Sequence, residues 1–389
     1  MNIGVLKEIK PDEKRVALQP EQIPELIKAG HTVYVEHNAG ISAGYNDQQY
    51  IKNGAKVSNK ENILKLSELI LKIKVPVLSE YSDYCEAHIL FAYLHFDENI
   101  SPENISRLIQ SGFMGIAYEW IEDNGHYPLL EPMSRLTGYL FAQKSIELCT
   151  KYKGILCGRH ERFSDGATAM IIGLGNIGLS ALKYYLDTKL NLIIIDKHPE
   201  TVNNRINKRF QTINIDYIQK YNLNIIVFDN NAPIRSKKQI KEILPKVDII
   251  LNCAVRRPNL PKDQLKYLID KRMLKSLSPG SVICDTTACN KDLVETCVSS
   301  EILDKYDIIQ DVIHYNCDHI PSYVSKTSTK ILTDASFPFI KEIANKGKRA
   351  AIRENEALKK GISCYKGKMT HKYTAIKKGF DYNNILHLL

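Results

Sequence analysis

A strand, a glycine-rich turn and a helix follow one another between residues 168 and 185, and this order constrains the fold more than any other stretch. The run TAMIIG reads as a strand, GLGNIG follows it, and LSALKYY continues with helical periodicity. Gly173 permits a tight turn, Gly175 lets the backbone approach a ligand, and Gly178 allows the helix to pack closely on the strand. Free N–H groups at the start of such a helix favour a phosphate.

The next strand-like run, LIII, ends in Asp196. A carboxylate at this point of a dinucleotide-binding unit accepts hydrogen bonds from the adenosine ribose and repels a 2′-phosphate, so the pattern predicts NAD. Lys197 and His198 beside it weaken that preference. We expect Asn176 and Ile177, which open the helix, to contact the cofactor as well. The alternative is an ordinary α/β turn that happens to contain glycines.

Strands and helices alternate along most of the chain, which is typical of parallel sheets covered by helices. The rhythm breaks near residue 130, where a long helical stretch (132–152) leads to a second set of strands, of which YDIIQ (306–310) is the last. The Lys-rich end is too short for a domain of its own. We therefore predict an α/β protein with two Rossmann-like domains. Residues 1–130 and 311–389 form a discontinuous substrate domain, and residues 131–310 form the NAD-binding domain.

Composition excludes several classes of protein. The net charge is +9, but Lys and Arg are interleaved with Asp and Glu, which argues against nucleic-acid binding. No apolar run is long enough to span a membrane. The first residues, MNIGVLKEIKPDEKR, are charged where a signal peptide needs an apolar core, so we expect a cytoplasmic protein. The nine cysteines lack Cys-x-x-Cys spacing, so we expect no metal site.

Ionisable residues end several strands of the first domain. Lys74 ends ELILKIK, His95 follows LFAYL, Glu119 follows MGIAY, and Arg15 comes soon after the first strand. Parallel sheets place ligands at the carboxyl ends of their strands. Arg and Lys can hold a carboxylate or polarise a carbonyl, and His can exchange a proton near neutral pH. Each residue alone has an ordinary structural explanation, and the prediction depends on their occurring together.

The chain resembles the alanine dehydrogenase/pyridine nucleotide transhydrogenase family, and alanine dehydrogenase more closely. The segments that carry the resemblance run through nearly the whole chain in order: MNIGVLKEIKPDEKRVALQP, KIKVP, LFAYLHF, GIAYE, PLLEPMS, KGILCG, the glycine loop, LSPGSVICD, KTST, ANKG and YKGKMTH. The resemblance implies an NAD(H)-dependent oxidoreductase that transfers hydride to or from the α-carbon of an amino acid, 2-oxo acid or imine. It also implies a small-molecule substrate and a homo-oligomer, either a dimer or a hexamer.

The resemblance also implies roles for individual residues. Arg15 and Lys74 match the positions that hold the substrate carboxylate and carbonyl, and His95 matches the catalytic acid/base. Ser134 matches a contact to the cofactor pyrophosphate, while Met133 and Tyr93 match residues that line the site. We further assign Met133 to the cofactor-binding set and Glu119 to the substrate pocket.

Four departures from the family pattern near this site bear on its chemistry. Cys289 stands where alanine dehydrogenases carry an aspartate, and His319 stands where they carry an asparagine that faces the substrate. Arg256 and Arg257 occupy a segment that is usually apolar. We include Cys289 among the candidate catalytic residues, although a small spacer is the simpler interpretation. We place His319 and Arg256 in the substrate pocket, where the arginines would suit a second substrate carboxylate.

Three hypotheses follow. The first is a dehydrogenase whose substrate is not strictly alanine. The second is an imine reductase that joins an amino acid and a 2-oxo acid, because reduction of a preformed imine needs no enzyme-activated water and tolerates loss of the aspartate. The third is a non-catalytic protein that still binds NAD, and retention of Lys74 together with His95 argues against it.

Overall fold

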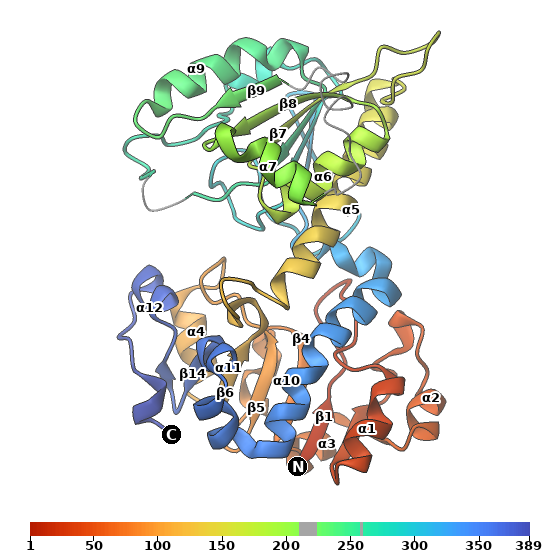
Figure 1. Ribbon diagram of the computed structural model, residues 1–389, viewed down its shortest axis with the longest axis vertical. Coiled ribbons are helices and arrows are strands. Elements are labelled where there is room, and N and C mark those ends of the chain that lie inside the picture. The colour runs from red at the N-terminus through yellow and green to blue at the C-terminus, as the bar shows by residue number, and fades with distance from the viewer. Residues whose placement is uncertain (210–223, 257–259) are drawn as a thin grey trace. The chain divides into compact units, whose positions relative to one another are not determined.

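The computed structural model describes residues 1–209, 224–256 and 260–389 (Figure 1). The chain divides into two compact units, each a Rossmann-like α/β assembly. Unit 1 contains residues Met1–Met133 and Pro321–Leu389, and unit 2 contains Ser134–Ile320. Unit 1 is thus discontinuous in sequence, and the Lys-rich C-terminal end belongs to it.

The sheet of unit 1 has eight strands in the order β15-β14-β6-β5-β4-β1-β2-β3. The strands are β1 Asn2–Val5, β2 Thr32–Glu36, β3 Lys56–Ser58, β4 Leu69–Lys74, β5 Ile89–Tyr93, β6 Met114–Ala117, β14 Ile362–Tyr365 and β15 Lys368–Met369. β1 to β6 pair in parallel, while β14 pairs antiparallel with both β6 and β15. β4 and β5 are buried along their whole length, as expected for central strands covered on both faces.

The helices of unit 1 are α1 Ile23–Lys28, α2 Asp47–Lys52, α3 Lys60–Leu66, α4 Pro102–Ile109, α10 Ser325–Glu354, α11 Glu356–Gly361 and α12 Lys372–Lys378. α4 begins as its sequence predicts, with the Ser101 hydroxyl accepting from the Asn104 N–H and Pro102 in the first turn. The long α5, Leu130–Lys153, starts in unit 1 and continues into unit 2. Within the described parts of the chain, no helix is both long and apolar enough to cross a membrane.

Among its described residues, unit 2 has a sheet of seven strands in the order β12-β13-β11-β10-β7-β8-β9. The strands are β7 Thr168–Ile172, β8 Asn191–Asp196, β9 Asn224–Val227, β10 Ile249–Asn252, β11 Val282–Asp285, β12 Asp307–Ile309 and β13 Val312–Tyr315. The helices that accompany them are α6 Asn176–Asp187, α7 Pro199–Arg209 and α9 Pro233–Ile243. All neighbouring strands are parallel except β12, which pairs antiparallel with β13.

The end of unit 2 differs from the expectation. We predicted the last strand of this sheet at 306–310 and placed residues 311–389 in the first domain. β13 instead supplies the parallel strand beside β11, and β12 is an antiparallel edge strand that precedes it. Residues 311–320 consequently lie in unit 2, because the chain turns back at Gln310 and Asp311, both of which have positive φ.

Candidate active site

The glycine loop in unit 2 connects β7 to α6, and the geometry explains each glycine. Gly173 has φ +87°, which favours glycine. A Cβ on Gly178 would lie 2.0 Å from the Gly173 carbonyl oxygen, so close packing excludes any side chain there. A Cβ on Gly175 would meet no atom within 4 Å, so the backbone at this point is open to a ligand. The predicted residues Asn176 and Ile177 form the first turn of α6.

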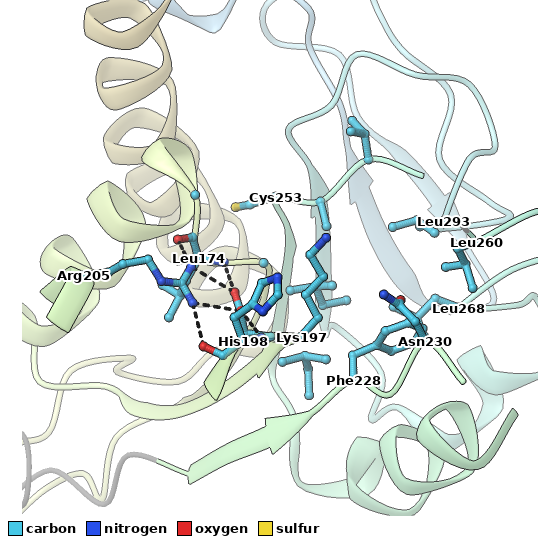
Figure 2. A pocket seen from close by; sticks show the side chains of 17 residues that line it. Leu174, Lys197, His198, Arg205, Phe228, Asn230, Cys253, Leu260, Leu268 and Leu293 are labelled. Atoms are coloured by element: carbon cyan, nitrogen blue, oxygen red, sulfur yellow. Dashed lines mark hydrogen bonds and ion pairs between the residues drawn. The ribbon is translucent and has the colours of Figure 1, made fainter. Parts of the chain in front are cut away.

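A cavity of about 280 Å³ lies at the carboxyl ends of β7, β8 and β10 in unit 2 (Figure 2). Its lining residues include Gly173, Asp196, Arg205, Phe228, Leu260 and Leu293. Figure 2 shows Arg205, Lys197 and His198 on one side of this space and the apolar side chains of Phe228, Leu260 and Leu268 on the other. The predicted Gly173, Gly175 and Asp196 all line this cavity. Asn176 and Ile177 lie beside it in the first turn of α6.

Asp196 is buried at the end of β8 and forms an ion pair with Arg205 of α7, which the sequence analysis missed. Its carboxylate also accepts from the backbone N–H groups of Leu174 and His198, both at 2.8 Å. Burial alone raises the pKa of Asp196, but the hydrogen bonds from Arg205 and the backbone outweigh it and lower the pKa. The carboxylate is therefore ionised.

Unit 1 brings Lys74, Tyr93 and His95 together at the carboxyl ends of β4 and β5. Lys74 pairs with Tyr93 in the sheet, and the Tyr93 and His95 rings stack with centroids 5.4 Å apart. The positive charge of Lys74 is near enough to lower the pKa of His95. Glu8, which the sequence analysis did not select, fixes the end of β4 by accepting from the backbone N–H groups of Ile73 and Lys74.

Two carboxylates control His95. Glu98 Oε1 lies 3.2 Å from the imidazole Nδ1, and Glu119 Oε1 accepts from the His95 backbone N–H at 2.6 Å. Burial alone lowers the pKa of His95, but the charges of Glu98 and Glu119 outweigh it and raise the pKa. Glu119 also accepts from the Leu94 N–H at 3.2 Å. Its carboxylate therefore holds the backbone around His95, whereas we had placed Glu119 in the substrate pocket.

Arg15 is buried in unit 1 and its guanidinium faces Glu13. Nε donates to Glu13 Oε1 at 2.7 Å and Nη2 donates to Oε2 at 2.5 Å. Nη1 lies 3.7 Å from Met133 Sδ, a weak acceptor, which places the predicted Met133 beside Arg15. Ser134, the next residue on α5, is half-buried and is the first residue of unit 2.

The structure corrects the role that we predicted for Arg256. Its Nε bonds to Asp292 Oδ1, Nη1 donates to the Leu260 and Leu265 carbonyls, and Nη2 donates to the Lys266 and Asp292 carbonyls. A guanidinium has five N–H donors, so these bonds use all of them. Arg256 holds its own loop together and leaves no donor for a substrate carboxylate. Arg257 lies outside the described residues.

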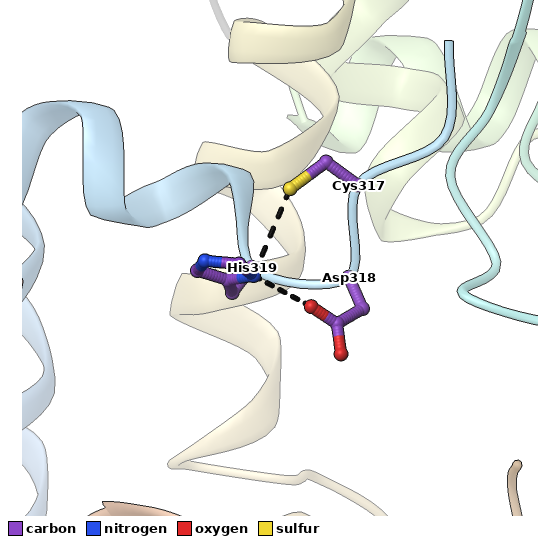
Figure 3. Close-up of side chains that lie close together, drawn as sticks. All are labelled: Cys317, Asp318 and His319. Carbon is purple, nitrogen blue, oxygen red and sulfur yellow. Dashed lines mark hydrogen bonds and ion pairs between the residues drawn. The ribbon is translucent and has the colours of Figure 1, made fainter. Parts of the chain in front are cut away.

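The two remaining departures from the family pattern lie in unit 2. Cys289 is half-buried in the loop after β11, next to Ala288, which has φ +53°. His319 is buried, and its Nδ1 lies 2.6 Å from Asp318 Oδ1 and 3.7 Å from Cys317 Sγ (Figure 3). Its Nε2 has no hydrogen-bond partner among the described residues.

Cys317, Asp318 and His319 offer three donor atoms within 4.8 Å of one another, which makes them a candidate metal cluster. Two tetrahedral zinc ligands at about 2 Å from the ion are more than about 3 Å apart. The 2.6 Å separation of Asp318 Oδ1 and His319 Nδ1 is instead that of a hydrogen bond. The arrangement therefore orients the His319 ring through Asp318 and turns Nε2 away from it.

Comparisons with known proteins match the chain over nearly its whole length. Two family domains match: "Alanine dehydrogenase/PNT, N-terminal domain" at residues 4–137 and "Alanine dehydrogenase/PNT, C-terminal domain" at residues 140–372. Alanine dehydrogenase from Methanococcus maripaludis is 32% identical over 390 residues, which cover 98% of this chain and 97% of the relative. Alanine dehydrogenase 1 from Staphylococcus aureus is 31% identical over 395 residues, covering 100% of both.

Solved structures give the same result. An L-alanine dehydrogenase structure matches with a TM-score of 0.81 and 27% identity, covering 97% of this chain and 99% of that one. A transhydrogenase from Sinorhizobium meliloti shares the fold, with a TM-score of 0.73 and 20% identity over 96% of this chain and 100% of that one. The fold, the glycine loop and these matches show that the chain belongs to the alanine dehydrogenase/PNT family.

Proposed function

We propose that this protein is an NAD(H)-dependent dehydrogenase that interconverts a small 2-amino acid and its 2-oxo acid. Membership of the family, with alanine dehydrogenases matching along the full length, supports an oxidoreductase of the amino-acid dehydrogenase type with NAD as its cofactor. The observation that carries the proposal is the convergence of Lys74, Tyr93 and His95 at the carboxyl ends of two adjacent strands. A protein that only bound a dinucleotide would have no chemical use for this cluster.

The residues of the cavity in unit 2 fit a dinucleotide. The open space at Gly175 and the N-terminus of α6 suit a pyrophosphate, and the apolar wall formed by Phe228, Leu260 and Leu293 suits a flat ring. NAD(H), when bound, supplies or accepts a hydride at the nicotinamide ring.

The side chains of unit 1 hold the substrate and move its proton. Arg15 Nη1, with the rest of the guanidinium fixed by Glu13, is placed to hold the substrate carboxylate. Lys74 polarises the carbonyl or imine carbon by stabilising negative charge that develops on its heteroatom. His95 exchanges a proton with that heteroatom, and its raised pKa keeps a proton available near neutral pH.

The geometry also bears on the substrate. We had reasoned that Arg256 and Arg257 suit a second substrate carboxylate, but every donor of Arg256 is already used within its loop. We therefore propose monocarboxylic substrates, alanine and pyruvate among them. Imine reduction is the second candidate, favoured by Cys289 at the position where the family carries an aspartate.

The test is NADH oxidation by the purified protein with ammonium and a panel of 2-oxo acids, repeated with amino acids in place of ammonium. We expect turnover with pyruvate and ammonium, and none with 2-oxoglutarate or oxaloacetate. The His95→Asn variant should bind NADH as the wild type does and lose turnover, since the substitution removes the proton-exchanging group and leaves the glycine loop and Asp196 intact. Turnover only with amino-acid amines would favour the imine reductase. NADH binding without any turnover would favour a non-catalytic protein.

A further inference from the structure

The carboxylate that should recognise the cofactor ribose is already saturated. Asp196 Oδ2 accepts from the Leu174 N–H at 2.8 Å and from Arg205 Nη1 at 3.3 Å. Asp196 Oδ1 accepts from the His198 N–H at 2.8 Å and from Arg205 Nη2 at 2.9 Å. A carboxylate offers about four acceptor positions, and these four bonds fill them. Ribose hydroxyls must therefore share or displace a bond that the protein makes itself.

Arg205 is fixed in this position from two sides. Its Nη1 donates to the Leu174 carbonyl in the glycine loop at 2.6 Å, and its Nη2 donates to the His198 carbonyl at 3.2 Å. Figure 2 shows the guanidinium between Leu174 and His198, at the edge of the cavity that it lines. Its side chain is 29% exposed, and these two carbonyls together with the Asp196 carboxylate take all four of its Nη hydrogens.

More cations surround this end of the cavity. Lys197 and His198 are exposed and line it together with Arg205. An adjoining polar recess is lined by Lys197, His198 and also Arg235. The acids nearby are compensated in part: Arg205 neutralises Asp196, and Glu200 lies 3.4 Å from the His198 ring. Asp229 lines the recess, where one of its oxygens accepts from the Asn231 N–H.

We propose that the ribose end of the site accepts a 2′-phosphate, so that the protein uses NADP(H) as well as NAD(H), and that Arg205 is the residue that permits it. The inference rests on the proposed function, which supplies the dinucleotide. A bare Asp196 would repel a phosphate dianion, but the paired one does not. Arg205 acts through Asp196, because its four Nη hydrogens already bond to protein oxygens, while the exposed Lys197 and His198 line the cavity and can meet the phosphate oxygens directly.

Direct binding tests this without relying on turnover. Wild-type protein is titrated calorimetrically with NADH and NADPH, and with 5′-AMP and 2′,5′-ADP, which report on the ribose end alone. We expect the dissociation constants for NADPH and NADH to agree within about tenfold, and those for the two fragments likewise. Raising the ionic strength from about 0.05 to about 0.5 M should weaken the binding of NADPH more than that of NADH, because only NADPH carries the additional phosphate.

Arg205→Ala should change the affinities for the two cofactors in different ways. NADPH and 2′,5′-ADP should bind about 10- to 100-fold more weakly, because the negative charge of Asp196 loses its counter-charge and repels the phosphate. NADH should bind equally or more tightly, because Asp196 becomes free for the ribose hydroxyls. A misfolded variant would weaken both cofactors. Arg205→Lys should restore part of the NADPH affinity. Lys208→Ala, an exposed residue of α7, should change neither.

Two results would overturn the proposal. If the wild type binds NADPH more than about 100-fold more weakly than NADH, and Arg205→Ala leaves that ratio unchanged, the ribose end selects NAD(H) alone. If neither dinucleotide nor either fragment binds, the cavity is not a dinucleotide site, and the proposed function falls together with this inference. Tight NADH binding with rejected NADPH leaves the proposed function standing.

Discussion

The Glu119 carboxylate holds the backbone of His95, with Oε1 accepting from the His95 N–H at 2.6 Å. His95 has φ +46°, a conformation that costs energy for a residue with a Cβ. Glu119 therefore stabilises the strained turn that aims the imidazole, and its charge raises the pKa of that imidazole. The Glu98 side chain contributes to the pKa through its contact with Nδ1, while the backbone N–H of Glu98 donates to the His95 carbonyl at 3.0 Å, a bond that a side-chain substitution keeps.

Glu98→Gln and Glu119→Gln should separate these two effects. Both remove a negative charge that raises the pKa of His95, so the His95 limb in the pH profile of kcat/KM should move to lower pH by about half a unit to one unit. Only Glu119→Gln should also lower kcat at the optimum, by about tenfold or more, because the imidazole loses its aim. Equal kcat in the two variants would show that the strained turn needs no support from Glu119.

Asp285 supplies a stability prediction. Burial raises the pKa of this carboxyl to about 6, against 3.8 ordinarily. Its Oδ1 accepts from Thr287 and Asn252, while Oδ2 has no hydrogen-bond partner among the described residues. Between these two pKa values the folded protein binds more protons than the unfolded chain, so the contribution of Asp285 to stability falls as pH rises from about 4 to about 6.

Asp285→Asn keeps the acceptor at Oδ1 and removes the buried charge. We expect the variant to be more stable than the wild type at about pH 8 by about 1 to 3 kcal/mol, and the difference to shrink toward pH 4. Urea unfolding at both pH values measures it, with Asp263→Asn, an exposed site, as control. A variant that is less stable at pH 8 would show that Oδ2 is satisfied in solution.

The sequence was informative where local pattern determines structure. Alternating strands and helices predicted both sheets, and the glycine spacing predicted the turn at Gly173 and the packing of Gly178. It was uninformative where a partner comes from elsewhere in the chain. The sequence near Arg256 does not indicate that Asp292 and the carbonyls of residues 260, 265 and 266 will accept the hydrogen bonds of its guanidinium. Strands β14 and β15, far along in sequence, join the first sheet at its β6 edge.

The partners of the predicted site residues show the same limit on a smaller scale. Glu13 and Glu98 lie two and three residues from Arg15 and His95, so spacing alone could have suggested them. Arg205 lies on the helix that follows Asp196. Helical periodicity predicts which face of that helix carries Arg205, but it does not predict the ion pair with Asp196.

Two glycine variants should fail in different ways. A Cβ at Gly178 would stand 2.0 Å from a backbone oxygen, so Gly178→Ala should destabilise the protein by about 2 to 4 kcal/mol. A Cβ at Gly175 meets nothing, so Gly175→Ala should fold normally but bind NADH about tenfold or more weakly, because the methyl group stands where the pyrophosphate should approach. Thermal unfolding and NADH titration of both variants measure this. Unchanged NADH binding by Gly175→Ala would show that the pyrophosphate does not bind at Gly175.

Arg256→Met tests the correction to its role. The substitution removes five hydrogen bonds and leaves Asp292, 15% exposed, without its ion pair, so we expect a loss of about 2 to 4 kcal/mol in stability. The KM for each 2-oxo acid should stay within about twofold of wild type at a temperature where the variant is folded. Arg272→Met, at an exposed position, is the matched control. A selective rise in KM for dicarboxylic acids would show that Arg256 contacts the substrate after all.

The Cys289→Asp variant tests whether the thiol lowers the rate of amino-acid deamination. A neutral thiol offers neither the negative charge nor the acceptor oxygens of a carboxylate, so it neither stabilises an ammonium group nor orients an attacking water. Cys289 is half-buried in a loop, where a carboxylate can reach solvent and the substitution should fold. We expect kcat/KM for alanine deamination with NAD to rise by about tenfold, and Cys289→Ser, which adds no charge, to leave it unchanged. Steady-state rates of both variants at one pH decide it. A fall in activity with both substitutions would mean that the thiol itself takes part in the reaction.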